Sequence, residues 1–423
     1  MQYFYTFLLY LIQPFVWIRL LCRSIKAPAY RHRWLERYGF CRHKVQSNGI
    51  LIHAVSVGET AAAVPLIKAL KKQYPDMPIT VTTMTPTGSE RVTTLLGQNV
   101  SHVYLPYDLP GAVNRFINTL KPQLVIIIET ELWPNFITAL YQKQIPLIIA
   151  NARLSERSAK GYAKFAHFTQ TILSRITLIA AQNEQDGQRF IDLGLPTSHL
   201  TVTGSIKYDI SLQAAEQDKI AQRRDKWQLN RPVWIAASTH SGEDEIILSV
   251  HQKLLHQHPD LLLILVPRHP ERFKEVEKQV INKSLDYVLL SQQSMPTAET
   301  AVLLGDTMGE LVTLYGLSDI AFIGGSLVER GGHNPLEAAL HKIPIITGPY
   351  TFNFKLIFQQ LQQAGGVLVA NKNPDELYHL VLNLIDDKTA AQQMGECAYQ
   401  VLRQNQGALG RLLKLIQGYI THA

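Results

Sequence analysis

Four charged side chains stand directly after apolar runs of the chain. Glu59 comes shortly after GILIHAVS, and Lys207 follows LTVTGSI. Glu129 and Glu131 follow the fully apolar run LVIII. A carboxylate held rigidly at such a turn can accept a proton, and a lysine there can neutralise an anionic leaving group or a substrate carboxylate. The same acids also suit helix capping and the helix dipole, so both interpretations remain open at this point.

A glycine-rich stretch, GGSLVERGGHNPLEAALHKIPIITGP, begins at Gly324. Asn334 is a natural N-cap, Pro335 fits the first helical position, and Glu337 falls in the first turn. The glycines before them allow close approach of the backbone or φ > 0. The stretch is either a well-capped helix after a flexible loop or a nucleotide cradle. In a cradle, the helix amides would bind phosphate, and Glu337 would accept hydrogen bonds from both hydroxyls of a ribose.

Two further segments place polar groups at predicted strand ends. In GDTMGEL, Gly309 and its neighbours lie at a predicted helix start, where backbone amides suit one phosphate without a metal. In VPRHPE, Arg268 follows the end of a predicted strand, as Lys207 does, although it could instead pair with Glu271. The histidines of the chain show no metal-ligand spacing, and this includes His240 and His333. The sequence therefore predicts no metal site.

Short runs rich in Val and Ile alternate with helical patterns, which predicts parallel strands covered on both faces. Neither a Walker lysine motif nor a G-x-G-x-x-G pattern is present. We predict an α/β protein of two Rossmann-like domains that face a cleft, with ligands at the carboxyl ends of the strands. The predicted boundaries are an N-terminal apolar helix over residues 1–22, a first domain over 23–208, a connection over 209–230, a second domain over 231–406, and a returning C-terminal helix over 407–423.

The basic charge of the chain is confined to its N-terminus. The first 44 residues hold eight Lys or Arg and one acid, Glu36, which accounts for the whole net charge of +7. They include the apolar segment from Tyr3 to Ile18, which is short for a bilayer span of about 20 residues. We predict a marginal signal anchor or a helix lying in the membrane surface, with the basic residues on the cytoplasmic face. A buried core helix is the alternative. Three cysteines without metal-ligand spacing indicate a reducing compartment.

Ten motifs in order make the chain similar to a known family. The chain resembles the 3-deoxy-D-manno-octulosonic acid (Kdo) transferases of Gram-negative bacteria over nearly its whole length. The resemblance implies two Rossmann-like domains in the GT-B arrangement and transfer of Kdo from CMP-Kdo to the lipid A precursor. The motifs are YLIQPFVWIRL, KAPAYRHRWLERYGF, VSVGET, TTMTPTGSERV, LPYDLP, ETELWPN, NARLSERS, ILVPRHPERF, GDTMGEL and GGSLVERGGHNPLEAA.

The resemblance also implies roles for individual residues. Glu59 would be the general base that deprotonates the acceptor hydroxyl, and Glu129, preferred over Glu131, would stabilise the transition state together with Lys207. The reaction would be an inverting single displacement without cofactor or metal. The expected partners are CMP-Kdo, the lipid A precursor and anionic lipids of the inner membrane, and no nucleic acid. The residues that match CMP-binding segments are Pro267, Arg268, Met308, Gly309, Glu310, Asn334, Pro335, Leu336 and Glu337.

Two alternatives remain at this stage. One is another two-domain sugar-nucleotide enzyme, such as a hexosyltransferase with a UDP donor or a UDP-sugar epimerase. The other is a membrane-docked nucleotide-sugar binder without catalysis. The sequence leaves open how many Kdo residues are added, whether the N-terminal segment spans the membrane or lies on it, the oligomeric state, and the extent of domain closure.

Overall fold

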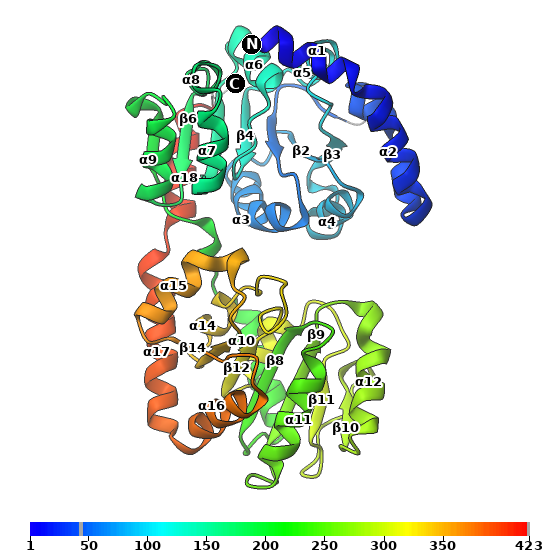
Figure 1. Ribbon diagram of the computed structural model, residues 1–423, viewed down its shortest axis with the longest axis vertical. Coiled ribbons are helices and arrows are strands. Elements are labelled where there is room, and N and C mark those ends of the chain that lie inside the picture. The colour runs from blue at the N-terminus through cyan, green and yellow to red at the C-terminus, as the bar shows by residue number, and fades with distance from the viewer. Residues whose placement is uncertain (42–44, 421–423) are drawn as a thin grey trace. The chain divides into compact units, whose positions relative to one another are not determined.

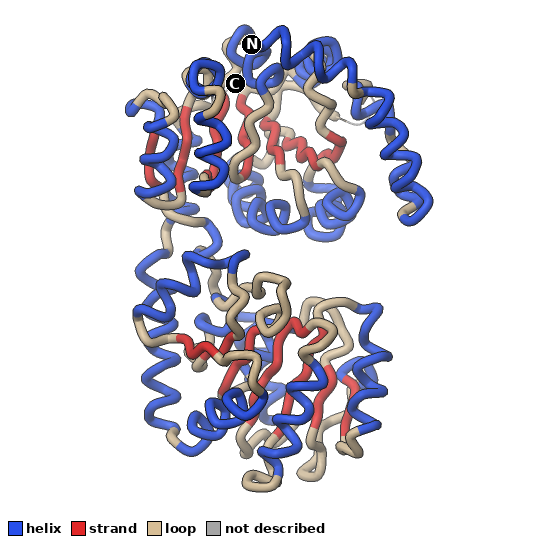
Figure 2. Tube along the Cα trace, in the orientation of Figure 1, coloured by secondary structure: helices blue, strands red, loops and turns tan. Residues whose placement is uncertain are grey.

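The structure is a computed structural model that describes residues 1–41 and 45–420. The chain forms two compact units, of which the first is Met1–Asp209 with Gln406–Ala423 and the second is Ile210–Asn405 (Figure 1). Each unit contains one sheet of seven strands, and every neighbouring pair of strands in both sheets is parallel. Helices flank the strands in each unit (Figure 2). The fourteen strands among the described residues coincide with the short apolar runs that the sequence predicts as strands.

The first sheet has the strand order β3-β2-β1-β4-β5-β6-β7. Its strands are β1 (Ile50–His53), β2 (Ile79–Thr83), β3 (Ser101–Tyr104), β4 (Leu124–Ile128), β5 (Leu147–Ala152), β6 (Leu178–Ala181) and β7 (Leu200–Val202). The helices of this unit that follow β1 are α3 (Val57–Gln73), α4 (Pro86–Leu96), α5 (Pro110–Leu120), α6 (Pro134–Gln142), α7 (Glu156–Ala163), α8 (Ala166–Leu173), α9 (Glu184–Asp192) and α18 (Ala408–Gln417).

Successive residues of the first sheet enter two separate cores, because side chains of a strand alternate between its faces. Ile50 and Ile52 of β1 pack in one core, which also contains Leu412 and Ile416 of α18. Leu51 packs in the other core with residues of α5, α6, α8 and α9. The C-terminal helix therefore covers one face of the first sheet, although more than 200 residues separate it from β7 in the sequence.

The second sheet has the order β10-β11-β9-β8-β12-β13-β14. Its strands are β8 (Val233–Thr239), β9 (Leu262–Pro267), β10 (Tyr287–Leu289), β11 (Val302–Leu304), β12 (Ile320–Ile323), β13 (Ile345–Thr347) and β14 (Val367–Val369). The helices of this unit are α10 (Ala214–Lys226), α11 (Asp244–Leu255), α12 (Phe273–Asn282), α13 (Leu311–Gly316), α14 (Leu336–Leu340), α15 (Lys355–Gln363), α16 (Pro374–Asp386) and α17 (Lys388–Asn405). The stretch 209–230, predicted only as a connection, thus contains α10, which belongs to the second unit.

The N-terminal segment folds as two helices, α1 (Gln2–Leu11) and α2 (Gln13–Lys26), with a bend of 47° between them. Within the part of the chain that the structure describes, no single helix has the length and apolar character needed to cross a membrane. Length and composition alone would allow the bent pair α1–α2 to do so. The segment predicted as an N-terminal apolar helix over residues 1–22 is thus helical in two parts, because the helix breaks at Ile12 and its second part continues to Lys26.

Candidate active site

Glu59 lies in the first turn of α3, directly after the carboxyl end of β1. Ser56 is the N-cap of this helix, and its hydroxyl oxygen accepts a hydrogen bond from the Glu59 amide at 3.3 Å. The Glu59 carboxylate accepts bonds from the Val55 amide at 2.7 Å and the Ser56 hydroxyl at 3.0 Å. Glu59 therefore completes a capping box, which is the structural role left open by the sequence. Each carboxylate oxygen has a second lone pair, so this role leaves room for a further hydrogen bond from a ligand.

The surroundings of Glu59 favour its protonated form. Burial raises the pKa of its carboxyl group, and the nearby charge of Glu129 raises it further. The hydrogen bonds from Val55 and Ser56 act in the opposite direction without cancelling the increase. A carboxylate with a raised pKa is a stronger base than an exposed one, which suits removal of a proton from a hydroxyl group.

Glu129 follows the last residue of β4 and pairs with Lys207 at 3.0 Å, where both side chains are 24% exposed. Its backbone has a φ of +61°, a conformation that costs energy for a residue other than glycine and often occurs at functional sites. Lys207 lies in a 3-10 turn, Ile206–Tyr208, whose first amide donates to the side-chain oxygen of Asn151 at 3.2 Å. The ends of β4, β5 and β7 thus fix this ion pair.

Glu131 lies within electrostatic reach of the other two acids of this edge. Burial raises its pKa to about 7, and the charges of Glu59 and Glu129 contribute to the increase. The structure therefore brings the three predicted carboxylates and Lys207 together at the carboxyl edge of the first sheet. Such groups of titratable residues with raised pKa values are typical of active sites.

At the carboxyl end of β12, the chain continues into the glycine-rich loop (residues 324–335). A Cβ atom on Gly324 would lie 2.6 Å from the backbone oxygen of Ser238, so the neighbouring strand excludes any side chain there. Gly325, Gly331 and Gly332 have positive φ values of 69°, 88° and 71°. Glycine is thus required at Gly324 by close approach of the protein's own backbone and at the other three positions by their conformation.

The helix after this loop, α14, begins at Leu336, one residue later than the sequence predicts. Asn334 still acts as a cap, because its side-chain oxygen accepts a hydrogen bond from the Leu336 amide at 3.2 Å, while Pro335 takes the N-cap position. Glu337 is half-buried in the first turn. Burial raises its pKa to about 7, Glu216 adds to the increase and Arg268 opposes it. A carboxyl group poised in this way can accept or donate hydrogen bonds.

The segment Met308–Gly309–Glu310 precedes α13. Met308 is exposed, and Gly309 has a φ of +85° with open space where a Cβ atom would be. The Glu310 carboxylate pairs with Lys219 at 2.8 Å and Arg223 at 2.7 Å, both from α10. Burial alone would raise the pKa of Glu310, but these two cations outweigh that effect and lower it. The Glu310 side chain is therefore occupied, and this segment offers its backbone amides to a ligand.

Arg268 follows Pro267, the last residue of β9, and its amide donates to the Thr239 oxygen at 3.0 Å. The alternative of an Arg268–Glu271 ion pair is wrong, because the Arg268 guanidinium pairs with no acid of the described chain. Instead, the Oε1 atom of Glu271 lies 4.0 Å from the Nδ1 atom of His269. Pro267 and Arg268 therefore lie at the same carboxyl edge of the second sheet as the glycine-rich loop.

Comparison with known proteins identifies the family. Residues 32–210 match the family described as 3-deoxy-D-manno-octulosonic-acid transferase (kdotransferase), and residues 230–401 match the glycosyl transferases of group 1. A 3-deoxy-D-manno-octulosonic acid transferase of Haemophilus influenzae is 49% identical over 421 residues, which cover 99% of each chain. The chain belongs to the Kdo transferase family.

Two other proteins place this Kdo transferase in context. A 3-deoxy-D-manno-octulosonic acid transferase of Bordetella pertussis is 32% identical over 98% of this chain and 99% of its own. The solved UDP-GlcNAc 2-epimerase of Neisseria meningitidis matches 88% of this chain and 100% of its own with a TM-score of 0.60. At 15% identity, that likeness concerns the fold alone. The predicted GT-B-like architecture with two parallel sheets and the assignment as a glycosyltransferase are confirmed.

The sequence alone does not single out Glu243, although the structure of this Kdo transferase gives it a central position in the second unit. It is fully buried, and its carboxylate accepts hydrogen bonds from the amides of His240, Gly325, Ser326 and Leu327 at 2.7–2.9 Å. Glu243 thereby fastens the glycine-rich loop to the turn after β8. It belongs to the stretch ASTHSGEDE at the end of β8, but its partners in the glycine-rich loop lie more than 80 residues away in the sequence.

We expect Glu243→Gln to loosen the glycine-rich loop. The amide side chain keeps one acceptor oxygen and points an NH₂ group at backbone donors, so about 3–5 kcal/mol of stability is lost from the second unit. The resemblance implies that this loop binds CMP, so the affinity for CMP, measured by calorimetry, should fall by about ten-fold or more when the loop is no longer held in place. Glu245→Gln, on the exposed side of the same helix turn, is the control and should leave both values unchanged. Equal CMP affinity in the two variants would contradict this role.

Three histidines lie beside the glycine-rich loop. The rings of His240 and His333 are stacked, their Nε2 atoms lie 2.9 Å apart, and His269 meets His240 edge-on. Burial lowers the pKa of His240 to about 4 and that of His333 to about 3, with neighbouring cations adding to the effect. Both rings are therefore neutral at physiological pH, and the N–H group of one ring donates a hydrogen bond to the ring nitrogen of the other. Within the described ranges, no group of three or more His, Cys, Asp or Glu side chains is arranged to hold a metal ion.

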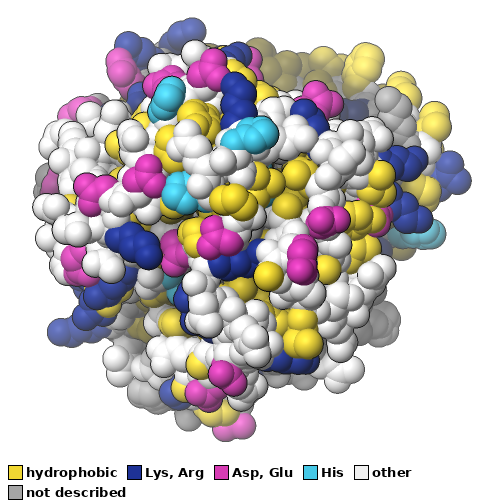
Figure 3. All heavy atoms as spheres, turned by 90° about the horizontal axis from the view of Figure 1, so that it is seen from below, with side chains coloured by type: hydrophobic (Ala, Val, Ile, Leu, Met, Phe, Trp, Pro, Cys, Tyr) yellow, Lys and Arg dark blue, Asp and Glu magenta, His cyan; other side chains and the backbone are white. Residues whose placement is uncertain are grey.

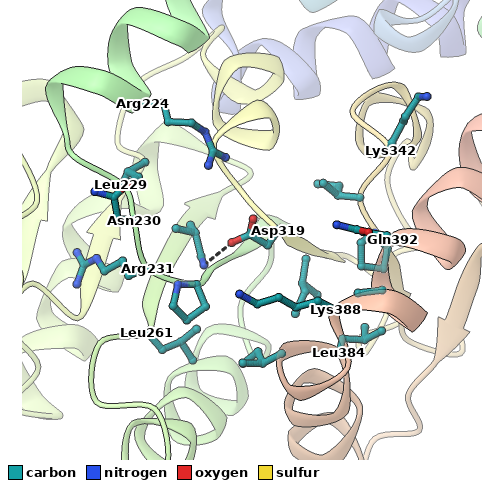
Figure 4. A pocket seen from close by; sticks show the side chains of 17 residues that line it. Arg224, Leu229, Asn230, Arg231, Leu261, Asp319, Lys342, Leu384, Lys388 and Gln392 are labelled. Atoms are coloured by element: carbon teal, nitrogen blue, oxygen red, sulfur yellow. Dashed lines mark hydrogen bonds between the residues drawn. The ribbon is translucent and has the colours of Figure 1, made fainter.

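The opposite edge of the second sheet contains a hollow of about 380 Å³. It lies where the strands begin, beside Val233 and Ile320, and Arg224, Lys388 and Asp319 reach its rim (Figure 4). Its lining residues include none of the predicted site residues, so it is separate from the candidate site. The face of the molecule in Figure 3 shows acidic and basic side chains interspersed, as expected from the even charge balance after the first 44 residues.

The raised pKa of Glu131 predicts a change of stability with pH. The folded state holds this proton more tightly than the unfolded chain, so the ionised carboxylate destabilises the fold increasingly as pH rises from about 4.5 to about 7. Allowing for partial exposure, Glu131→Gln should stabilise the first unit by about 1–2 kcal/mol at about pH 8 and lose most of this gain at about pH 5. Amide hydrogen exchange of β4 and β5 measures the difference, and a gain that is independent of pH would contradict this account.

Proposed function

We propose that this Kdo transferase moves Kdo from CMP-Kdo to the lipid A precursor lipid IVA, in synthesis of the lipopolysaccharide core, at the cytoplasmic face of the inner membrane. The observation that carries this proposal is the group of Glu59, Glu129, Glu131 and Lys207 at the carboxyl edge of the first sheet. It combines a half-buried carboxylate whose pKa is raised with a fixed cation, and transfer to a hydroxyl acceptor needs both groups.

On the acceptor side, Glu59 takes the proton of the attacking hydroxyl group. The acceptor oxygen then forms a bond to the anomeric carbon of Kdo as the bond from that carbon to the phosphate oxygen of CMP breaks. This single displacement inverts the anomeric configuration and forms no covalent intermediate with the enzyme. The raised pKa of Glu59 supports the assignment, because the carboxylate must hold the proton it accepts.

On the donor side, CMP leaves as an anion that keeps the electron pair of the broken bond. Lys207, with Glu129 holding it in place, supplies positive charge for the transition state. Pro267 and Arg268, the amides of Met308, Gly309 and Glu310, and the segment from Asn334 to Leu336 bind the nucleotide, while Glu337 bonds to the ribose hydroxyls. The place of Arg268 directly after β9, at the carboxyl edge of the second sheet, and the open space over Gly309 support this part of the proposal. The enzyme uses no metal and no cofactor for this step.

The test is an assay of the purified full chain with lipid IVA and either CMP-Kdo or UDP-sugars, with mass spectrometry of the lipid product. We expect product only with CMP-Kdo, and the mass of the lipid should increase by one or more Kdo units. The same spectrum gives the number of Kdo units that were added. Turnover with a UDP-sugar alone would support the hexosyltransferase alternative instead. CMP-Kdo binding without turnover on any lipid acceptor would favour the non-catalytic binder.

A further inference from the structure

The helices α1 and α2 pack on the rest of the first unit with a side that is mostly polar. Eight positions between residues 2 and 25 are half-buried or buried, and they recur every three or four residues, as one helix face does. Five of the eight carry polar groups, which is the reverse of a helix that packs on a soluble core. The eight are Gln2, Tyr5, Thr6, Leu9, Gln13, Val16, Leu20 and Ser24.

The outward side of the same helices is apolar. Tyr3 is 93% exposed, Phe15 71% and Ile25 76%. An exposed apolar surface of this extent marks a binding face for another apolar surface. The other large apolar side chains exposed on these two helices are Phe4, Phe7, Leu8, Tyr10, Leu11, Ile12, Trp17, Ile18 and Leu21.

The polar side of α1 is hydrogen-bonded to α6 and to the end of α8. The Gln2 amide nitrogen donates to the side-chain oxygens of Asn135 at 3.1 Å and Thr138 at 2.9 Å, and the Gln2 oxygen accepts from Arg175 at 3.1 Å. Thr6 donates to the same Asn135 oxygen at 3.1 Å. We call this set of contacts, together with those of Tyr5, the polar latch.

Tyr5 completes the polar latch through Asp108 of the motif LPYDLP. The Tyr5 hydroxyl donates to the Asp108 carboxylate at 3.0 Å. Asp108 is buried and also accepts the backbone amides of Asn135 and Phe136 at 2.9 and 2.7 Å, so it caps α6 at the same time. Asp108 of LPYDLP and Asn135 of ETELWPN thus hold α1 against the rest of the first unit. This is a structural role for both motifs, beside the candidate catalytic residues Glu129 and Glu131 of ETELWPN.

The helix α2 is fixed in the same manner. The Tyr38 hydroxyl donates to the Gln13 oxygen at 3.0 Å, and the indole of Trp17 is hydrogen-bonded to the same Tyr38 oxygen. Near its end, Ser24 accepts a bond from Arg31 at 3.3 Å. Arg19, Arg23 and Arg31 are exposed along this stretch. The apolar outward side therefore adjoins cations, as anionic headgroups require.

We propose that α1 and α2 lie flat in one leaflet of an anionic bilayer, held parallel to it by the polar latch, and do not cross the membrane. This inference rests on the membrane location in the proposed function and resolves how the chain attaches. A span would pull Gln2, Tyr5 and Thr6 away from Asp108 and Asn135 and place their polar groups in hydrocarbon, where they cost energy. Lying flat keeps every one of these bonds and buries the outward side in the interface.

The decisive test is a depth measurement on the full chain bound to phosphatidylcholine vesicles with about 30% phosphatidylglycerol. Single spin labels replace Tyr3, Ile12 and Ile25 in a chain whose native cysteines are substituted. We expect all three at a similar shallow depth, about 5–10 Å below the headgroups. Ile12 near the bilayer centre, about 15 Å deep, with Tyr3 and Ile25 at opposite surfaces, would establish a span and overturn the proposal.

The contribution of the polar latch is measured separately, without lipid. In Tyr5→Phe/Thr6→Val the caps of α6 remain, and we expect amide exchange in α1 to become faster by about ten-fold or more. Tyr3→Phe, on the outward side of the same helix, is the matched control and should leave exchange unchanged. Equal exchange in both variants would show that the polar contacts do not hold α1, and the proposed latch would fall.

The charge requirement gives a third measurement. Arg19→Gln/Arg23→Gln should weaken binding to the anionic vesicles by about 25-fold, about five-fold per arginine. A chain that dimerises through α1–α2 in sedimentation and ignores vesicles would show that a second copy covers the apolar side, and would overturn the proposal. These vesicle experiments need neither donor nor acceptor. Transfer to detergent-dispersed lipid IVA is measured independently, so a failure of docking and a failure of the proposed reaction are distinguishable.

Discussion

Replacing Glu59 by glutamine is expected to lower kcat for Kdo transfer by about 10²–10⁴-fold, because the amide cannot accept the proton of the acceptor hydroxyl. The measurement is initial-rate kinetics with CMP-Kdo and lipid IVA, together with calorimetry of CMP binding. CMP affinity should stay within about two-fold, since Glu59 belongs to the first unit and the predicted nucleotide contacts to the second. A loss confined to the chemical step would identify Glu59 as the base.

The substitution tests chemistry without removing the helix cap. Glutamine is accepted at this position of a capping box, so the bond from the Val55 amide and the start of α3 are retained. Glu184→Gln is the matched control, because Glu184 also lies in a first helical turn of the first unit, after the Asn183 cap, but is exposed. If Glu59→Gln keeps kcat within about three-fold of the control, Glu59 serves the helix cap alone and the base must be sought elsewhere.

Much of the fold is predictable from the sequence because the strands are buried on both faces. The run LVIII becomes β4, which is completely buried, and its apolar character is therefore uninterrupted. The acid that follows such a run must lie at the carboxyl edge of the sheet, so the joint placement of Glu59, Glu129 and Lys207 follows from chain order and topology. Side-chain chemistry at that edge, such as the raised pKa of Glu131, depends on distances that no local pattern contains.

Contacts between distant segments are what the sequence does not reveal. Glu310 is predicted to face the nucleotide, but its partners Lys219 and Arg223 come from a stretch with the pattern of a polar connection. Glu243 binds a loop more than 80 residues downstream and resembles any other acid at a helix start. In both cases the local pattern fits a solvated residue, and only the tertiary structure supplies the partner.

The N-terminal segment shows the limit of hydropathy in another way. Its composition allows a span, a surface helix or a core helix, and these differ in what the few polar residues contact. Gln2 and Tyr5 are unremarkable in the sequence and become informative only because Asn135 and Asp108 face them. A similar argument applies to Gly324, where the need for glycine comes from Ser238 of a neighbouring strand.

Replacing Lys207 by methionine is expected to lower kcat/KM for Kdo transfer by about 10²–10³-fold, the usual effect of losing one group that stabilises transition-state charge. Lys160→Met is the control, because Lys160 forms an exposed ion pair with Glu156 in the same unit, and such pairs contribute little. Activity of Lys207→Met within about three-fold of this control would contradict a role in the transition state.

A double variant decides what Lys207 does. Loss of the cation leaves Glu129 beside Glu59 and Glu131 without its ion pair, so part of the lost activity could come from repulsion among the carboxylates. Lys207→Met/Glu129→Gln removes that repulsion. If Lys207 serves only to neutralise Glu129, the double variant should recover most of the activity measured in the same kinetic assay. If its charge acts on the departing CMP anion, the double variant should remain about as slow as Lys207→Met, because no other group replaces that charge. We expect the second result, since Glu129 and Lys207 are both partly exposed and the ammonium group, which has three donors, can bond to a ligand oxygen while it keeps its carboxylate partner.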